Sequence, residues 1–357
     1  MKIKNQIIKL MLGAIIAFTN FSCTEGDNDK TIDKLPTIVE IAKADPQFSV
    51  LAKALQVYGL ENTLSGQGSY TVFAPTDTAF AAQGITMATL NATAALNLPQ
   101  TDPSLTAIRR ILQNHVLGVG TRSSDLLFTG YSKTFAAGPA GLPSNAANTN
   151  LSIFVNLIGT DVLVNGGVAN GGAKVIKADI DASNGIIHVV DGVILLPTLV
   201  NHVIANPAFS TLLSIVTSTG GTFGNQAPVL AVLTGATAAL PKTVFAPLNS
   251  AFATATTTGF LTVPYIATAG NVTKVLQYHV TAANVNTSTS AFSSTSWASS
   301  LQTIITVAPV SQSFTIAPNT LKITSAFTGS LVSNIKVVNV QAVNGVIHAV
   351  DTVLQPN

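Results

Sequence analysis

The segment Thr71–Phe80, TVFAPTDTAF, returns almost unchanged at Thr243–Phe252 as TVFAPLNSAF, 172 residues further along the chain. Each copy predicts a short strand that ends at Ala-Pro, because proline lacks the N–H that a strand needs and keeps the preceding residue extended. A helix is expected to follow each strand. Thr76 and Asp77 are suitable caps for it in the first copy, and Asn249 and Ser250 are suitable caps in the second.

Three further segments recur in the same order. They are Ala44–Leu51 with Ala205–Leu212, Ile111–Val116 with Val275–Val280, and Asn184–Asp191 with Asn344–Asp351. A repeat at domain-sized spacing in a chain of 357 residues predicts two tandem domains, each large enough to bury its own core. We place them at residues 35–197 and 198–357.

These motifs resemble the signature segments of fasciclin domains, and the resemblance covers residues 35–357. It implies an α+β fold in two tandem fasciclin-like domains, each a β-sandwich or wedge with packed α-helices. It also implies a place among secreted and surface-anchored adhesion proteins.

Local patterns support an α+β fold independently. Asp102 is a good N-cap and Pro103 a good first residue of a helix that we expect to end at Gly118. One face of this helix carries Leu105, Ile108, Ile111, Leu112, His115 and Val116. The same spacing places His279 on the apolar face of a second helix. Short β-branched runs with Asn-Gly turns predict strands in the back half of each copy.

The N-terminus predicts export. Residues 1–22 combine early lysines with an apolar stretch from Leu10 to Phe21, as in a secretory signal peptide. Cys23, the single cysteine, follows directly, and its position resembles that of the lipidated cysteine of bacterial lipoproteins. Residues 23–34 would then be a lipidated tether that holds the protein in the cell envelope, at the outer membrane or cell surface. The alternative is an ordinary cleaved signal with an incidental cysteine.

The composition argues against a nucleic-acid partner. Charged residues make up only 9% of the chain, against about a quarter in an average soluble protein. Removing Lys2, Lys4 and Lys9 with the signal lowers the 17 basic residues to 14, against 15 acidic ones. Nucleic-acid binding rests on clustered lysine and arginine, which this sequence lacks.

The sequence predicts neither an enzyme nor a metal or cofactor site. Each copy holds two motif histidines about 70 residues apart and no thiol, which does not suit zinc. His188 and Asp191 are three apart on one strand and face opposite sides, so they cannot form a catalytic pair. We expect structural hydrogen bonds instead from a set of recurring polar residues. This set comprises Asp77, His115, His188, Asp191, Asn249, His279, His348 and Asp351.

The resemblance also points to candidate binding residues. Fasciclin adhesion has been associated with an Asp-Ile pair before the last strand, matched here by Asp179 and Ile180, and with a Tyr-His pair, matched by Tyr278 and His279. Neither copy holds both features. The expected function is adhesion to a surface or matrix protein or a glycan. The alternative is a glycan- or apolar small-ligand-binding accessory lipoprotein, for which Trp297 beside Phe292 would be an aromatic platform.

Overall fold

The computed structural model describes residues 35–126, 130–138, 149–236, 241–257, 270–281, 301–303, 313–317, 321–325 and 332–356. The predicted signal peptide, Cys23 and the tether lie outside the described residues, as do Phe292 and Trp297.

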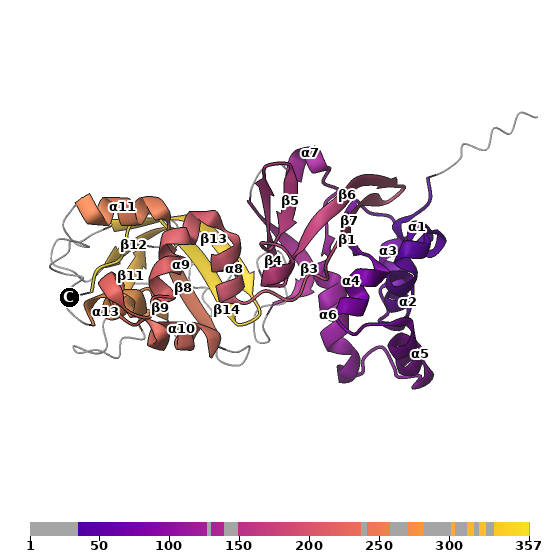
Figure 1. Ribbon diagram of the computed structural model, residues 1–357, viewed down its shortest axis with the longest axis horizontal. Coiled ribbons are helices and arrows are strands. Elements are labelled where there is room, and N and C mark those ends of the chain that lie inside the picture. Colours follow the sequence, from indigo (N-terminus) through magenta and orange to yellow (C-terminus); the bar gives the residue numbers. More distant parts are fainter. Residues whose placement is uncertain are drawn as a thin grey trace, which may run out of the picture. The chain divides into compact units, whose positions relative to one another are not determined.

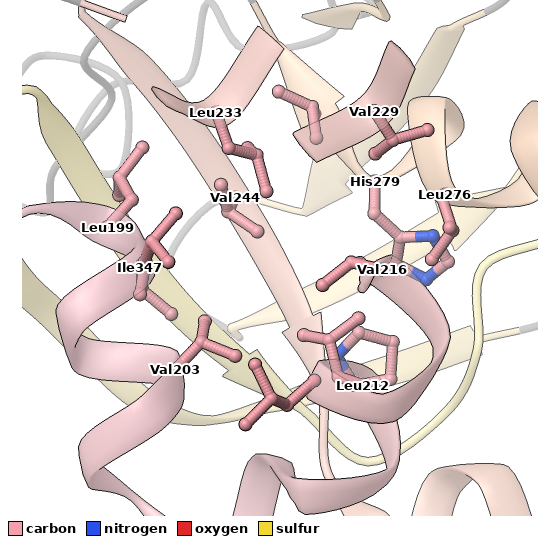
Figure 2. A pocket seen from close by; sticks show the side chains of 14 residues that line it. Leu199, Val203, Leu212, Val216, Val229, Leu233, Val244, Leu276, His279 and Ile347 are labelled. Atoms are coloured by element: carbon pink, nitrogen blue, oxygen red, sulfur yellow. The ribbon is translucent and has the colours of Figure 1, made fainter. Parts of the chain in front are cut away.

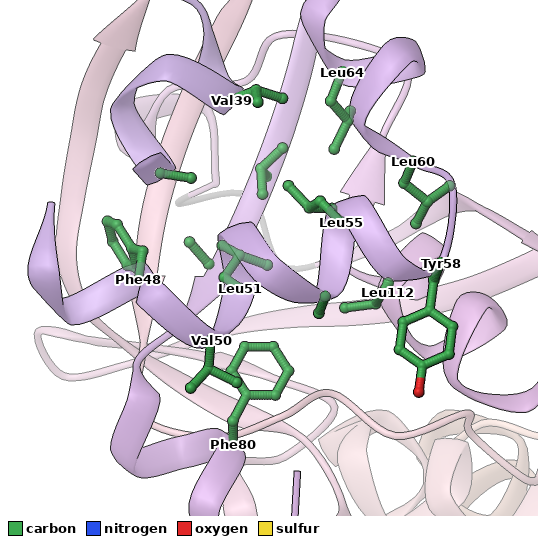
Figure 3. Close-up of a cluster of buried hydrophobic side chains, with 14 of the residues drawn as sticks. Val39, Phe48, Val50, Leu51, Leu55, Tyr58, Leu60, Leu64, Phe80 and Leu112 are labelled. Atoms are coloured by element: carbon green, nitrogen blue, oxygen red, sulfur yellow. The ribbon is translucent and has the colours of Figure 1, made fainter. Parts of the chain in front are cut away.

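The first repeat starts with short helices that pack beside its sheet (Figure 1). Its helices are α1 (Ile38–Ala44), η1 (Pro46–Phe48), α2 (Ser49–Val57), α3 (Glu61–Ser65), α4 (Asp77–Ala82), α5 (Met87–Ala95), η2 (Pro103–Leu105), α6 (Thr106–Asn114), α7 (Ser123–Leu126) and η4 (Val168–Asn170). Helix α2 buries an apolar face that includes Leu51 and Leu55. Figure 3 shows this face against Phe48, Leu64 and Phe80 in the core of the repeat.

Seven strands of the first repeat close into a barrel. They are β1 (Tyr70–Pro75), β2 (Val116–Leu117), β3 (Gly130–Ala137), β4 (Asn150–Ile158), β5 (Asp161–Val164), β6 (Ala173–Ala182) and β7 (Gly185–Val190). All neighbours are antiparallel except β1 and β7, which run parallel with Phe73 opposite His188. The TVFAP segment is therefore a strand next to the last one, and Thr76 caps α4 as the sequence predicts.

The described part of the second repeat follows a similar order, with helices before and after its first strand and the remaining strands towards its end. Its helices are α8 (Leu199–Ala205), η5 (Pro207–Phe209), α9 (Ser210–Val216), η6 (Gly221–Phe223), α10 (Ala227–Thr234), α11 (Asn249–Thr257) and α13 (Asn271–Tyr278). Its strands are β8 (Lys242–Pro247), β9 (Val280–Thr281), β10 (Leu301–Gln302), β11 (Ser313–Ala317), β12 (Lys322–Ser325), β13 (Val332–Ala342) and β14 (Gly345–Val350). They form one sheet in the order β10-β11-β12-β13-β14-β8-β9, and β8 and β14 are again parallel. The predicted α+β class is confirmed in both repeats.

The predicted helix from Asp102 to Gly118 is wrong at its C-terminal end. Asp102 does cap Pro103, but the helix ends at Asn114 and Val116 already pairs with Val72 in β1. The cause lies in the sheet, because the Phe73 N–H donates to the His115 carbonyl at 3.0 Å and draws the chain into β2. His115 is the C-cap residue rather than a mid-helix residue.

Within the part of the chain described above, no single helix is long and apolar enough to cross a membrane. The bent pair Leu199–Ala205 and Pro207–Val216, with 101° between its halves, meets that test by length and composition.

Candidate functional site

His115 and His279 occupy equivalent buried sites at the ends of α6 and α13. The His115 Nδ1–H donates to the Ile111 carbonyl at 2.7 Å, and its Nε2 accepts from the Ile194 N–H at 2.8 Å. His279 repeats both bonds, to the Val275 carbonyl and from the Leu354 N–H, each at 2.8 Å. Each imidazole thus joins its helix to the segment after the last strand.

Burial governs the charge of both imidazoles. It lowers the pKa of His115 and of His279 to about 4, and the hydrogen bond to the helix carbonyl only partly offsets that decrease. Both rings are neutral at pH 7 with both nitrogens engaged. Neither ring has a nitrogen left to accept a substrate proton.

His188 and His348 stand in the middle of the last strands, β7 and β14. The His188 Nδ1 accepts from the Asp179 N–H at 3.3 Å, and its Nε2–H donates to the Thr121 carbonyl at 2.9 Å. The His348 Nδ1 likewise accepts from the Asn339 N–H at 3.3 Å. Asp179 and Asn339 both adopt a left-handed backbone, with φ of 59° and 58°, at register shifts of β6 and β13. The histidines therefore fix the same bulge in both repeats.

The bulge in the first repeat brings Ser123, Asp179 and His188 together, a grouping that the sequence did not predict. The Ser123 N–H donates to the Asp179 carboxylate at 2.8 Å, and the Ser123 hydroxyl donates to its other oxygen. Burial raises the pKa of Asp179, but the bonds from Ser123 and the charges of His188 and Arg122 lower it overall. The carboxylate faces the serine and the imidazole faces a backbone N–H. The geometry of a serine triad is absent from this group.

Asp77 and Asn249 form hydrogen bonds to the N-terminus of an earlier helix, α2 in the first repeat and α9 in the second. The Asp77 carboxylate accepts from the Ser49 hydroxyl at 2.5 Å and from the Val50 N–H at 2.9 Å. Asn249 accepts from the Thr211 N–H at 3.0 Å in the second repeat and also donates to Pro207 and Ser210. An amide replaces the carboxylate with the same effect on the helix N-terminus.

Asp191 and Asp351 tie the end of the last strand to the neighbouring strand. Asp191 accepts from the Lys174 N–H at 2.7 Å, and Asp351 accepts from the Asn334 N–H at 2.8 Å. Burial raises the pKa of Asp351, but hydrogen bonds from Asn334, Lys336 and Thr352 outweigh it and lower the value to about 2. Every recurring polar residue of the set predicted from the sequence thus has a structural partner.

The two candidate binding pairs differ in accessibility. Tyr278 is 0% exposed and His279 is 3% exposed, so neither side chain reaches a surface. Asp179 and Ile180 are half-buried, and Ile180 packs against the core of its repeat. Asp181 next to them is exposed and forms an ion pair with Arg122 at 2.7 Å. A partner could reach the Asp179 side of β6 but not the Tyr278 side of α13.

A small apolar cavity of about 30 Å³ lies in the second repeat (Figure 2). Helices α8, α9, α10 and α13 and strands β8 and β14 supply its walls, which include Leu199, Val203, Leu212, Val229, Leu276 and His279. A cavity that holds benzene is about 150 Å³, so this one is too small for a ring. Among the described residues, no group of three or more histidine, cysteine, aspartate or glutamate side chains could hold a metal ion.

The roles of three further residues, Asn184, Lys133 and His202, were not predicted from the sequence. Asn184 accepts from the Ile38 N–H at 3.0 Å and donates to the Leu64 and Gly66 carbonyls, so it connects the first helix to the last turn. Its recurrence as Asn344 was a usable signal, although the Asn-Gly pair indicated only a turn. Lys133 and His202 lie outside every recurring motif, and no sequence pattern indicated their roles.

The chain resembles known proteins over both repeats. The fasciclin domain family matches residues 46–197 and 207–356. "Uncharacterized protein sll1735" of Synechocystis sp. is 35% identical over 164 residues, which are 45% of this chain and 99% of that protein. "Protein sll1483" of the same organism is 35% identical over 165 residues, 46% of this chain and 76% of that protein.

More distant matches are shorter or weaker. "Transforming growth factor-beta-induced protein ig-h3" of Sus scrofa is 50% identical over 46 residues, 13% of this chain and 7% of that protein. The solved structure "Novel Fold Revealed by the Structure of a FAS1 Domain Pair from the Insect Cell Adhesion Molecule Fasciclin I" is 15% identical. Its TM-score is 0.45, and the match covers 89% of this chain and 96% of that one.

The two family matches account for most of the chain, and they coincide with the two repeats of helices and sheet. Fasciclin domains are generally linked to cell adhesion and are typically extracellular or secreted. This chain belongs to the fasciclin family and carries two fasciclin domains in tandem.

Proposed function

We propose that this protein is an exported, lipid-anchored adhesion protein that binds a cell-surface or matrix partner, protein or glycan, without catalysis. One observation carries the proposal. The polar residues that recur in both repeats, which would be the candidates for chemistry, are engaged in hydrogen bonds that hold helices and strands together. The recurring sequence builds a scaffold, which suits a binding module better than an enzyme.

The proposed contact face is the Asp179 side of strand β6. Asp179 is held by Ser123, and Ile180 is anchored in the core, so the backbone of this bulge is fixed before any partner arrives. The exposed pair Arg122–Asp181 lies beside it. A preorganised backbone reduces the ordering cost of binding.

The test is a binding assay of the full chain against purified matrix proteins and a glycan array. Asp181→Lys reverses a charge on the proposed face and should weaken capture of a genuine ligand by tenfold or more. Asp161→Lys is the matched control, because Asp161 forms an ion pair with Lys174 at 2.8 Å on another strand and has a similar side-chain exposure. Equal binding by both variants would exclude this face, and failure of every ligand would count against adhesion.

The lipid anchor is tested separately. Cys23→Ala should move the protein from the membrane fraction to the soluble fraction, because two or more acyl chains are what holds a lipoprotein stably on a bilayer. Mass spectrometry of the wild-type N-terminal peptide should find acyl groups on Cys23. Identical fractionation of wild type and variant would contradict the anchor and leave the adhesion proposal open.

An accessory protein for small apolar ligands is the second candidate, and the apolar cavity in the second repeat is the observation that favours it. Its volume of about 30 Å³ fits the end of an alkyl chain rather than a pigment. Organic extraction of the protein purified from its native membranes should release a bound lipid if this candidate is right. An empty extract would leave adhesion as the sole proposal.

A further inference from the structure

The two repeats meet at a junction between β3, β4 and η4 of the first and α8 and β13 of the second. Lys133 on β3 lies at its centre. Its Nζ donates to the Asn150 carbonyl at 3.0 Å and, across the junction, to the Asn339 carbonyl at 2.6 Å. The Gln341 N–H donates to the Ser152 hydroxyl at 3.0 Å beside it.

The side-chain amides of Asn170 and Asn201 also hydrogen-bond across the junction, and an aromatic pair forms its third part. Tyr131 on β3 packs edge-on against His202 on α8, with ring centroids 5.5 Å apart and planes at 70°. The Tyr131 hydroxyl accepts from the Asn206 side-chain amide at 3.2 Å. His202 is 0% exposed, and its Nε2–H makes a long bond of 3.4 Å to the Gln341 carbonyl. Its Nδ1 has no hydrogen-bond partner among the residues that the structure describes.

The charges at the junction make His202 sensitive to acid. Burial, with a smaller effect from the positive charge of Lys133, lowers the pKa of His202 to about 4 against the opposing effect of the hydrogen bond to the Gln341 carbonyl. Burial also lowers the pKa of Lys133 to about 8 and raises that of Tyr131. These are the titratable groups that face His202 from β3. The residues that hydrogen-bond or pack against Tyr131, Lys133 or His202 from β4, α8 and β13 are neutral: Asn150, Phe154, Asn206, Asn339 and Gln341.

The junction is separate from the hydrophobic clusters of the described residues, of which each repeat holds two. No cluster draws buried residues from both repeats, and within the described residues Tyr131 is the hydrophobic side chain of the first repeat that packs against a cluster of the second. Backbone carbonyls, amides, hydroxyls and one ammonium group make the remaining contacts. The junction can therefore part without opening any of these clusters.

We propose that the junction is an acid-sensitive joint, in which protonation of His202 beside Lys133 releases the second repeat from the first while both remain folded. A protonated His202 places a second cation in a buried site that already holds an ammonium group. Opening lets water reach the imidazole and separates the two charges.

The difference in the pKa of His202 between the open and closed junction determines how far acid shifts the equilibrium between the two. With an ordinary pKa of about 6.5 in the open state and about 4 in the closed state, acidification from pH 7 to pH 5 shifts the equilibrium about 20-fold towards the open form. His115 and His279 also lose stability in acid, but each bonds within its own repeat. Their protonation weakens folding and leaves the junction contacts untouched.

The experiment measures the distance between the repeats by spin labels in the full chain. Cys23→Ser removes the single native thiol, and Thr63→Cys and Thr219→Cys place labels at exposed positions, one in each repeat. The distance distribution should be narrow at pH 7 and broad at pH 5, while circular dichroism at pH 5 still reports folded repeats. His202→Gln, which keeps a donor for the Gln341 carbonyl without titrating, should remain narrow at pH 5.

Lys133→Met supplies a second readout. It removes the positive charge beside His202, so the distance distribution should broaden only at a lower pH than in wild type. Broadening of His202→Gln at the same pH as wild type would overturn the proposal. A wild-type distribution that stays narrow until circular dichroism is lost would overturn it too, because the joint would then not open before the repeats unfold.

Discussion

The buried histidines of this protein differ in how completely their ring nitrogens are satisfied. His115 and His279 use one nitrogen as a donor and the other as an acceptor, each at 2.7 to 2.8 Å. His202 has one long bond of 3.4 Å. A fully bonded neutral imidazole makes a rigid connection between two elements, whereas a partly bonded one is held mainly by its packing.

We therefore predict that His115→Ala and His279→Ala each lower the free energy of unfolding by about 1 to 4 kcal/mol. The change leaves a cavity and deprives a buried N–H, of Ile194 or Leu354, of its acceptor. Urea unfolding of each variant measures the loss, with the exposed Thr63→Ala as a control that should stay within about 0.5 kcal/mol of wild type. Unchanged unfolding together with lost ligand binding would instead assign these histidines to a binding site.

Among the elements, the parallel pair of strands determines where glycine is required. Gly185 starts β7 opposite Tyr70, with φ of 156°, and a Cβ there would lie 2.2 Å from the Tyr70 carbonyl oxygen. Gly345 starts β14 opposite Lys242, and its Cβ would lie 2.1 Å from that carbonyl oxygen. Only a residue without a side chain permits this approach of the two backbones.

Gly185→Ala and Gly345→Ala should each cost about 2 to 4 kcal/mol of stability, because a strand of the sheet must shift rather than a flexible side chain. Gly220→Ala is the matched control, since nothing lies within 4 Å of the position that a Cβ would take there and its φ of 169° suits any residue. Thermal unfolding should show a lower melting temperature for the first two variants than for Gly220→Ala. Equal melting of all three would show that the close approach is not a constraint on the fold.

The strands and turns of the recurring motifs could be predicted from the sequence. Features fixed by hydrogen bonds to residues far away in the sequence could not. The strand at Thr71 and the turn at Asn184 were predictable because local residue types determine them. The end of α6 at Asn114 was not, because the hydrogen bond from Phe73 that stops the helix comes from another element. The bulge at Asp179 escaped detection for the same reason, since its partner Ser123 is 56 residues away.

For the whole molecule, hydrophobic clusters that stay within one repeat and a largely polar junction favour each repeat as a folding unit. We predict that residues 35–197 and residues 198–357 each fold cooperatively when produced alone. The second should be less stable alone, because separation leaves the Asn339 carbonyl without Lys133 and exposes His202. Calorimetry of both halves and the full chain tests this. Loss of a cooperative transition in either half would mean that its core depends on the other repeat.

Acid should destabilise the whole protein before its carboxylates are protonated. Burial lowers the pKa of His115 and His279 from 6.5 to about 4, so the unfolded chain binds more protons than the folded one between those values. The stability that these residues provide is complete above pH 6.5 and is lost as the pH falls towards 4. Asp351, whose pKa hydrogen bonds lower to about 2 against the opposing effect of burial, loses its contribution only below about pH 4.

The unfolding free energy in urea should therefore fall by several kcal/mol between pH 7 and pH 4.5, up to about 2 to 3 kcal/mol for each imidazole. A chain with His115→Gln and His279→Gln should be less stable at pH 7 but should lose less on acidification, because those positions no longer titrate. The slope of the unfolding free energy against pH separates proton linkage from a simple loss of packing. A loss of packing would lower the unfolding free energy equally at every pH and leave the slope unchanged. A wild-type curve that is flat from pH 7 to pH 4.5 would mean that these histidines are protonated as easily in the folded protein as in the unfolded chain.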